Sequence, residues 1–326
     1  MRPESITITK NKSGIETENN LGEKYTVRKK TGFNLFAFFS ALDIATIFYI
    51  VISGIYLCFG ISKLEDVLLH FVSRFVALSL IVWIAYINQK YPGKFIGLLK
   101  NIYPVFFLSF FYTETGYLKN IIFPYNLDIH FVYAEQWLWG CQPSLQFAQV
   151  MPQNWFNEFM NVCYFSYYPL IMGICIIFYF DNKQHSSKSI FTIIFSFYLY
   201  YIFYDIIPVV GPQFHFNTLY TDTPPPYYMG KFMRYILTNL EKPTGAFPSS
   251  HVGIALIISI ISFKHLKKYF YYSLLFVFGI CFATVYLKAH YLVDVIGAIL
   301  TVPVLMFISS YVYDKINSYL NTKMVK

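Results

Sequence analysis

Long apolar stretches constrain this chain more than any other feature of its sequence. A hydrocarbon core about 30 Å thick requires about 20 apolar residues in a spanning helix. The candidate spans, in chain order, are residues 34–60, 67–88, 101–118, 157–180, 189–210, 250–264, 269–288 and 291–313. The sequence therefore predicts an all-α fold, a polytopic membrane bundle of about eight helices.

The composition agrees with a membrane protein. Of 326 residues, 56% are hydrophobic and 13% are charged, whereas soluble domains are about 45–50% apolar and 25% charged. This excludes a disordered chain, a disulfide-rich secreted module and an ordinary cytosolic enzyme. The five cysteines show no Cys-x-x-Cys spacing and are expected to be buried free thiols. The net charge of +8 indicates basic membrane loops and no nucleic-acid partner.

Loop charges predict the orientation. Residues 1–33 are polar and basic, with no early apolar core typical of a signal peptide, and are expected to form a disordered cytoplasmic tail. With this tail inside, most Lys and Arg residues lie in loops on the same side, as cytoplasmic loops require. Two long loops, 119–156 and 211–249, then lie on the other side. Trp137 and Trp139 in the first of them indicate an interfacial helix.

The segment GAFPSSHVG, residues 245–253, opens the sixth predicted span. Pro248 and the small residues after it favour a helix start. The backbone N–H groups of Ser249 and Ser250, together with the helix dipole, would then form an anion site. His251 lies in the first turn, where it could give or take a proton near a bound phosphate.

A second cluster begins the last predicted span. His290 and Asp294 are spaced i and i+4, so they share one face of a helix. A carboxylate beside an imidazole fixes its tautomer and raises its basicity, as a nucleophilic or general-base histidine requires. Taken singly, each cluster is also typical of a structural role. Both clusters lie on the same predicted membrane face, however, and one helical hairpin joins them, which favours a common site.

These residues carry a family resemblance. FPSSH (247–251) followed by His290-x-x-x-Asp294 resembles the second and third signatures of the type-2 phosphatidic acid phosphatase superfamily. More narrowly, the chain resembles the inositol phosphorylceramide synthase branch, the inositolphosphotransferases of fungi and their bacterial relatives. The segments that resemble this branch are GAFPSSHVG, TVYLKAHYLVDVIGA (284–298), PVVGPQ (208–213), EQWLWGCQPSLQF (135–147) and YFSYYPL (164–170).

The resemblance implies roles for these residues. His290 would be the nucleophile that forms a phosphohistidine-type intermediate, and Asp294 would orient it. His251 would protonate the leaving alcohol and then deprotonate the incoming one. Ser249, Ser250 and nearby amides would hold the phosphate oxygens.

The resemblance also implies a six-helix core and, with it, a division of the chain. Residues 1–33 would be the basic tail, 34–99 two additional spans, and 100–326 the catalytic membrane domain.

Two departures from the phosphatase pattern concern charge. The third phosphatase signature begins with Ser-Arg, where this chain has Ala283-Thr284. The first signature pairs a Lys with Arg-Pro, where this chain has Gly211-Pro212-Gln213 and no arginine. A phosphomonoester carries a charge of about −1.5 to −2 at neutral pH, whereas a phosphodiester carries one negative charge and needs less cationic compensation. The loss of arginine therefore favours a diester substrate, with Gln213, Lys288 and Lys242 as further substrate-binding candidates.

The sequence thus predicts an enzyme that transfers phosphoinositol from phosphatidylinositol, as donor, to ceramide or a related sphingoid lipid, without metal or cofactor. The alternatives are a lipid phosphatase acting on phosphatidate or a polyprenyl pyrophosphate, and a lipid-binding or transporter-like protein with a degenerate site. The expected location is the bacterial inner membrane with the site on the non-cytoplasmic face, or a Golgi-type membrane with a lumenal site.

Asp43, Arg74 and Asp205 are charged residues inside predicted spans, where charge is costly and usually paired. We expect Asp43 and Arg74 to pair with each other and to join the first two spans. Asp205 could either face the site or cap a neighbouring helix.

Overall fold

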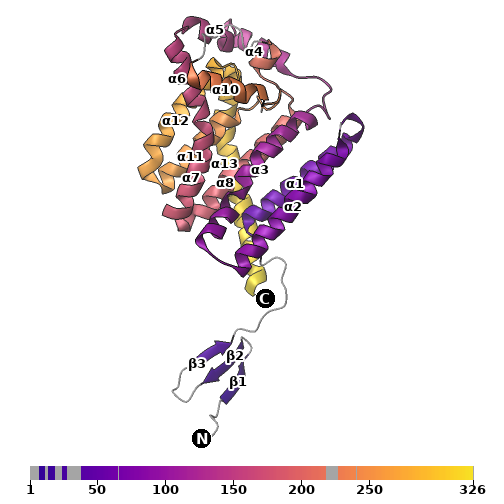
Figure 1. Ribbon diagram of the computed structural model, residues 1–326, viewed down its shortest axis with the longest axis vertical. Coiled ribbons are helices and arrows are strands. Elements are labelled where there is room, and N and C mark those ends of the chain that lie inside the picture. The colour runs from indigo at the N-terminus through magenta and orange to yellow at the C-terminus, as the bar shows by residue number, and fades with distance from the viewer. Residues whose placement is uncertain are drawn as a thin grey trace. The chain divides into compact units, whose positions relative to one another are not determined.

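The computed structural model (Figure 1) describes residues 7–11, 14–18, 24–27, 38–64, 66–217, 227–239 and 241–325. The chain divides into two compact units, residues 1–38 and 39–326.

The first unit contains a three-stranded antiparallel sheet in the order β1-β2-β3. The strands are β1 (Thr7–Asn11), β2 (Gly14–Glu18) and β3 (Lys24–Val27). Thr7 pairs with Glu18, and Ile15 pairs with Val27. The sequence predicts a disordered tail here, and the structure differs at these strands. The physical reason is local: β-branched Thr, Ile and Val recur along segments that are otherwise polar, and such residues favour extended backbone.

The second unit is a bundle of long apolar helices. Seven helical segments among the described residues are long and apolar enough to cross a membrane, and α11 (Ser250–His265) is a shorter apolar helix. The seven are α1 (Ala41–Phe59), α2 (Val67–Lys90), α3 (Lys94–Leu118), α6 (Asn154–Phe165) continued by α7 (Tyr167–Asp181), α8 (Lys183–Ile206), α12 (Lys267–Tyr286) and α13 (Leu292–Val325). The prediction of an all-α polytopic bundle is confirmed for this unit.

Short helices occupy the two long loops. The first loop contains α4 (Asp128–Trp139) and α5 (Pro143–Val150), and the second contains α9 (Pro212–His215) and α10 (Tyr228–Asn239); η2 (Ile61–Lys63) links α1 to α2. Gly140 ends α4 with a left-handed φ of 68°, which glycine adopts without steric cost. Figure 1 shows α4, α5 and α10 at the end of the bundle opposite the C-terminus. The segment predicted as one interfacial helix is thus two short helices.

Helix α8 lies at the centre of the bundle and packs against α1, α3, α7, α11 and α13. Its buried face carries several tyrosines, whose hydroxyl groups need partners inside an apolar core. Tyr198 meets Thr46 of α1 at 3.0 Å, and Tyr201 donates to the Leu108 carbonyl of α3 at 3.1 Å. Tyr204 donates to the Pro248 carbonyl at 3.2 Å and accepts from the Ser250 amide at 3.1 Å. The central helix therefore fixes the start of α11.

The expected pair between Asp43 and Arg74 is wrong, because both side chains join α3 instead. Arg74 contacts both carboxylate oxygens of Glu114, at 2.5 and 2.9 Å. Asp43 accepts from Tyr103 at 2.9 Å and lies 3.5 Å from Lys100. The reason is position along α1: Gly54 is the α1 residue beside Arg74, and eleven residues of helix place Asp43 about 16 Å away.

Asp205 of α8 belongs to this same N-terminal region. Its backbone carbonyl accepts from Tyr56 of α1 at 3.0 Å, and the charges of Glu114 and Arg74 act on its side chain. The first two spans therefore belong to one compact unit with the rest of the bundle. The division of the chain after residue 99 stays a prediction.

The buried Arg74–Glu114 pair generates a first prediction. Arg74→Met removes the bidentate partner of buried Glu114, leaves it, among the described residues, only the contact with His70 at 3.0 Å, and should lower the free energy of unfolding by about 3–5 kcal/mol. The double variant Arg74→Met/Glu114→Leu removes both charges and should recover most of that loss. Thermal unfolding of the purified protein in detergent measures both. A double variant no more stable than the single one would show that the pair is not the source of the effect.

Candidate active site

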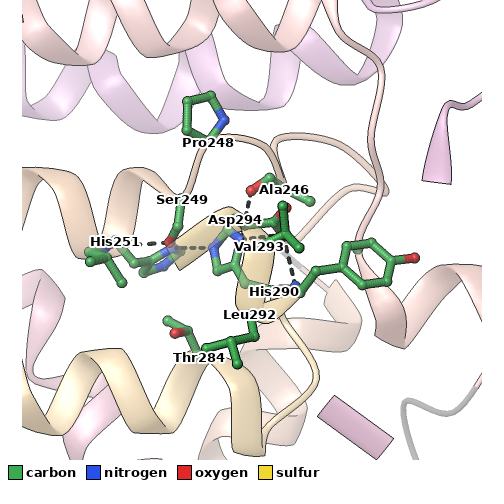
Figure 2. A network of polar contacts seen from close by, with 12 residues as sticks. Ala246, Pro248, Ser249, His251, Thr284, His290, Leu292, Val293 and Asp294 are labelled. Atoms are coloured by element: carbon green, nitrogen blue, oxygen red, sulfur yellow. Dashed lines mark hydrogen bonds and ion pairs between the residues drawn. The ribbon is translucent and has the colours of Figure 1, made fainter. Parts of the chain in front are cut away.

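Two histidines from separate elements meet at the end of the bundle that carries the short helices. His251 lies in the first turn of α11, and His290 lies in the loop between α12 and α13. The Nδ1 atom of His251 is 3.2 Å from the Nε2 atom of His290. Figure 2 shows the two imidazoles facing each other, with Asp294 from the first turn of α13 beside them. The structure thus brings together all three residues that the sequence predicts to be catalytic.

The contacts of His290 determine which of its nitrogens carries hydrogen. Its Nδ1 atom is 2.8 Å from the carbonyl oxygen of Ala246. A carbonyl oxygen only accepts, so Nδ1 must donate, and the Nε2 atom of the neutral ring then holds a lone pair. It follows that His251 donates its Nδ1–H to that lone pair. The Nε2 lone pair of His290 therefore faces a proton donor.

Asp294 lies on the other side of the His290 ring. Its Oδ2 atom is 3.4 Å from Nδ1 of His290 and accepts from the Tyr291 amide at 2.8 Å. Its Oδ1 atom is buried and has no hydrogen-bond partner in the described part of the chain. The nearest partner of Nδ1 is thus the Ala246 carbonyl, and the carboxylate is placed to stabilise positive charge on the ring.

Burial sets the protonation of His290. Only 2% of the residue is exposed. This burial lowers the pKa of His290 to about 4, although the hydrogen bond to Ala246 and the charge of Glu241 act in the opposite direction. Because an ordinary histidine has a pKa near 6.5, His290 is held as the neutral imidazole at pH 7. That is the form that can attack phosphorus.

The start of α11 is built largely by internal hydrogen bonds. Ser249 is the N-cap, and its hydroxyl accepts from the Val252 amide at 3.4 Å. The Ser249 amide donates to the Asp294 carbonyl at 3.2 Å, and the Ser250 amide donates to Tyr204. The sequence predicts these two amides as an anion site. In the structure both already have acceptors, because the helix start is held against α8 and α13.

The loop after α8 packs on the loop that carries His290. The Gln213 amide donates to the Lys288 carbonyl at 2.8 Å. Gly211 has a φ of 90°, and a Cβ atom there would lie 2.6 Å from the Ala289 carbonyl oxygen, so glycine is required for this approach. Lys288 is fully buried, with a left-handed φ of 61°. The backbones of Gln213 and Lys288 therefore help to hold the His290 loop.

Lys242 lies against α3, where its side chain approaches Gly116. The residue before it, Glu241, is the one whose side chain joins the site. Its Oε1 atom accepts from Tyr164 at 3.0 Å, and its Oε2 atom accepts from Gln213 Nε2 at 3.2 Å. Burial raises the pKa of Glu241, whereas these two hydrogen bonds and nearby His290 lower it. The sequence gives no signal for Glu241, because it belongs to none of the recognised motifs.

Two acidic residues of α4 hold the neighbouring loops, and sequence reasoning missed both. Glu135 accepts from the amides of Leu292 at 2.5 Å and Val293 at 3.3 Å, so it caps α13 just before Asp294. Burial raises the pKa of Glu135 to about 7, against the effect of these two hydrogen bonds. The available signal was the position of Glu135 at the start of EQWLWG.

Asp128 makes the second of these connections. It accepts from the amide of Val210 and from that of Gly211, at 2.9 Å for the latter, and from the Tyr291 hydroxyl at 3.1 Å. Burial raises the pKa of Asp128, and the same hydrogen bonds oppose that shift. One carboxylate thus joins the loop after α8 to the residue that follows His290.

Aromatic rings complete the surroundings of His251. The ring centroids of Tyr164 and Tyr167 lie 4.8 and 4.3 Å from that of His251. Tyr167 also donates to the Ser250 carbonyl at 3.4 Å. Within the described ranges, no three His, Cys, Asp or Glu residues are arranged as metal ligands. The arrangement provides a nucleophile, a proton donor and a carboxylate in a largely apolar setting.

The cap at α13 generates a second prediction. Glu135→Ala removes the acceptor for two buried amides and should lower the free energy of unfolding by about 1–2 kcal/mol. Glu135→Gln keeps an acceptor oxygen at the same place and should lose less than half as much. Thermal unfolding in detergent compares the two variants. Equal losses would mean that the charge of Glu135, and not its hydrogen bonds, stabilises the helix start.

Comparison with known proteins adds the family. The model of the PAP2 superfamily matches residues 130–312, more than half of the chain, from α4 to α13. A PA-phosphatase related-family protein of Dictyostelium discoideum is 29% identical over 204 residues, which are 61% of this chain and 31% of that protein. The chain thus spans about a third of the length of this relative. No solved structure matches. The matched range contains His251, His290 and Asp294. The chain belongs to the PAP2 superfamily.

Proposed function

We propose that this protein is a membrane phosphotransferase that moves phosphoinositol from phosphatidylinositol to ceramide or a related sphingoid lipid and releases diacylglycerol. Membership of the PAP2 superfamily supports an enzyme that acts on phosphate esters. The observation that carries the proposal is the contact between the two histidines, in which Nε2 of neutral His290 faces Nδ1 of His251 at 3.2 Å.

The reaction would proceed in two halves on these atoms. The donor phosphate displaces His251 from Nε2 of His290, and the Nε2 lone pair forms a bond to phosphorus. The bond from phosphorus to the diacylglycerol oxygen breaks, and His251, acting as the imidazolium, gives a proton to that oxygen and becomes neutral. In the second half, His251 takes the proton of the ceramide hydroxyl, whose oxygen bonds to phosphorus as the bond to His290 breaks. His251 thus recovers its proton, and His290 passes the phosphoryl group on to ceramide, so both histidines return to their starting states.

Asp294 and Ala246 serve the intermediate in this scheme. Phosphorylation of Nε2 puts a positive charge on the His290 ring, whose Nδ1–H stays directed at the Ala246 carbonyl. The Asp294 carboxylate, 3.4 Å from Nδ1, stabilises that charge without taking the proton.

The residues in place of the phosphatase arginine support a diester substrate. Thr284 is fully buried, its hydroxyl donates to the Cys281 carbonyl at 3.2 Å, and its carbonyl accepts from the His290 amide at 3.0 Å. It therefore has a structural role and supplies no positive charge. A singly charged phosphodiester needs less compensation than a phosphomonoester.

We place the site on the non-cytoplasmic face, either of a bacterial inner membrane or, as a lumenal site, of a Golgi-type membrane. The support is the distribution of Lys and Arg in the loops. Glu135 of α4 binds the amide of Leu292, close to His290. The helices α4, α5 and α10, which lie at one end of the bundle, come from the two long, less basic loops.

Hydrolysis is the second candidate function. The relative from Dictyostelium discoideum is described as related to PA-phosphatases, and water in place of the ceramide hydroxyl would complete the same two half-reactions. The substrate would then be phosphatidate or a polyprenyl pyrophosphate, and inorganic phosphate would be released.

A lipid assay separates the two functions. Purified protein in mixed micelles with fluorescent ceramide and phosphatidylinositol should give a new anionic ceramide product, with no inorganic phosphate. His290→Ala should abolish the product, and His251→Ala should slow its formation by roughly 10²–10⁴-fold. His265→Ala, at the opposite end of α11, is the matched control and should retain activity. Release of phosphate from phosphatidate without a ceramide product would establish the phosphatase instead.

The protonation of His290 generates a prediction about pH. Its pKa is lowered to about 4 by burial, so the attacking lone pair persists well below pH 6.5 and is lost only as the pH falls through that lower value. We expect the acid limb of kcat/KM to lie below about pH 5. A pH–rate profile, with circular dichroism as the check on folding, measures it. An acid limb near pH 6.5 would show that the essential histidine is solvated.

A further inference from the structure

We infer that Glu241, Gln213 and Tyr164 form a subsite for the hydroxyl groups of a polyol headgroup, and that Glu241 disfavours doubly charged phosphomonoesters at the adjacent histidine pair. This inference rests on the proposed function and extends it from the reacting atoms to the choice of donor lipid.

Contacts place the three residues beside the reacting centre. Tyr164 packs beside His251, with ring centroids 4.8 Å apart, and its hydroxyl donates to Glu241 Oε1 at 3.0 Å. Gln213 Nε2 donates to Glu241 Oε2 at 3.2 Å, and the Gln213 backbone is bonded to the His290 loop. Glu241 also acts electrostatically on His290. The cluster therefore adjoins both histidines.

The hydrogen-bonding character of the cluster selects its ligand. Both oxygens of Glu241 accept hydrogen bonds, as expected for an ionised carboxylate, which has further lone pairs to offer. Gln213 is 3% exposed, and its Oε1 atom is buried without a hydrogen-bond partner in the described structure. The unused capacity of these two residues is thus that of acceptors. The non-bridging oxygens of a phosphodiester are also acceptors, so they cannot form hydrogen bonds with these oxygens. An alcohol hydroxyl is a donor and can bond to them.

The charge of Glu241 adds selection against phosphomonoesters. A carboxylate near the phosphate position repels any bound phosphate, and the repulsion grows with the charge of the ligand. A phosphomonoester carries about twice the charge of a phosphodiester at neutral pH. A polyol phosphodiester offsets this repulsion with hydroxyl hydrogen bonds to the same carboxylate, whereas phosphatidate has no headgroup hydroxyl to offer. Glu241 therefore separates the two donor classes.

Binding of three soluble ligands to the purified 326-residue chain in detergent tests the inference. The ligands are glycerophosphoinositol, which is a polyol diester, dimethyl phosphate, a diester without hydroxyl groups, and inorganic phosphate. In Glu241→Gln, inorganic phosphate should bind roughly tenfold more tightly and dimethyl phosphate about threefold more tightly, because a repulsive charge is removed. Glycerophosphoinositol should bind about fivefold more weakly, because an ionised acceptor is lost. Isothermal titration measures the affinities.

Two further variants serve as controls. Asp314→Asn removes a carboxylate from the exposed ion pair with Lys188 and should change none of the three affinities. Gln213→Ala removes the neutral acceptor and should weaken glycerophosphoinositol alone. This variant tests the hydroxyl subsite independently if Glu241→Gln fails to fold. Weaker binding of all three ligands in both site variants, or no change in any of them, would overturn the inference.

The outcomes separate this inference from the proposed function. In one outcome, Glu241→Gln binds phosphate more tightly and glycerophosphoinositol more weakly, while the wild-type protein makes no ceramide product. That result would support the subsite and reject the transfer. If the wild-type protein does make the product, but Glu241→Gln changes both affinities in the same direction, the subsite alone would be rejected. Kinetic measurements show whether the bound hydroxyl belongs to the donor or to the acceptor lipid. Glu241→Gln should raise the KM for phosphatidylinositol and leave the KM for ceramide unchanged. The reverse result would assign the cluster to the acceptor lipid.

Discussion

The hydrogen bond from His290 Nδ1 to the Ala246 carbonyl is the interaction on which the site depends. It fixes the tautomer that leaves a lone pair on Nε2, and it joins the segment before α11 to the loop before α13. Other backbone bonds repeat this connection: Ala246 donates to the Val209 carbonyl at 3.1 Å, and Ser249 donates to the Asp294 carbonyl. Three loops from distant parts of the chain thus form one hydrogen-bonded unit, which the helices beneath them hold in place.

The first long loop contributes buried carboxylates to this unit. Asp128 binds two amides of the loop after α8, and Glu135 binds two amides at the start of α13. A buried carboxylate is costly unless it is hydrogen-bonded, and here each one also satisfies backbone donors that would otherwise be orphaned. Helix α4 is therefore a structural part of the site, which explains why its sequence combines acidic residues with interfacial tryptophans.

The sequence predicts features that depend on neighbouring residues, such as spans and motifs. It does not predict which distant residues contact one another in the folded bundle. Span lengths followed from apolar runs, and His251, His290 and Asp294 followed from motifs with a fixed spacing. Arg74 was assigned to the wrong partner, because several carboxylates are available and only helix packing selects Glu114. The amides of Ser249 and Ser250 were expected to be free, but their acceptors come from α13 and α8. Glu241 had no motif at all, since its importance arises from the approach of Tyr164 and Gln213.

The charge balance of the site follows from these contacts and limits its chemistry. Burial keeps His290 neutral, Thr284 is found where the phosphatase pattern has arginine, and carboxylates lie on two sides of the imidazole pair, at Asp294 and at Glu241. A site of this kind stabilises positive charge better than negative charge, so it suits the cationic ring of a phosphohistidine more than a dianionic ground state. A phosphate ester with one negative charge exploits this balance best, since its charge is offset once the ring becomes positive. In the proposed exchange between two lipid alcohols, the only further requirement is the proton that His251 would give and take back.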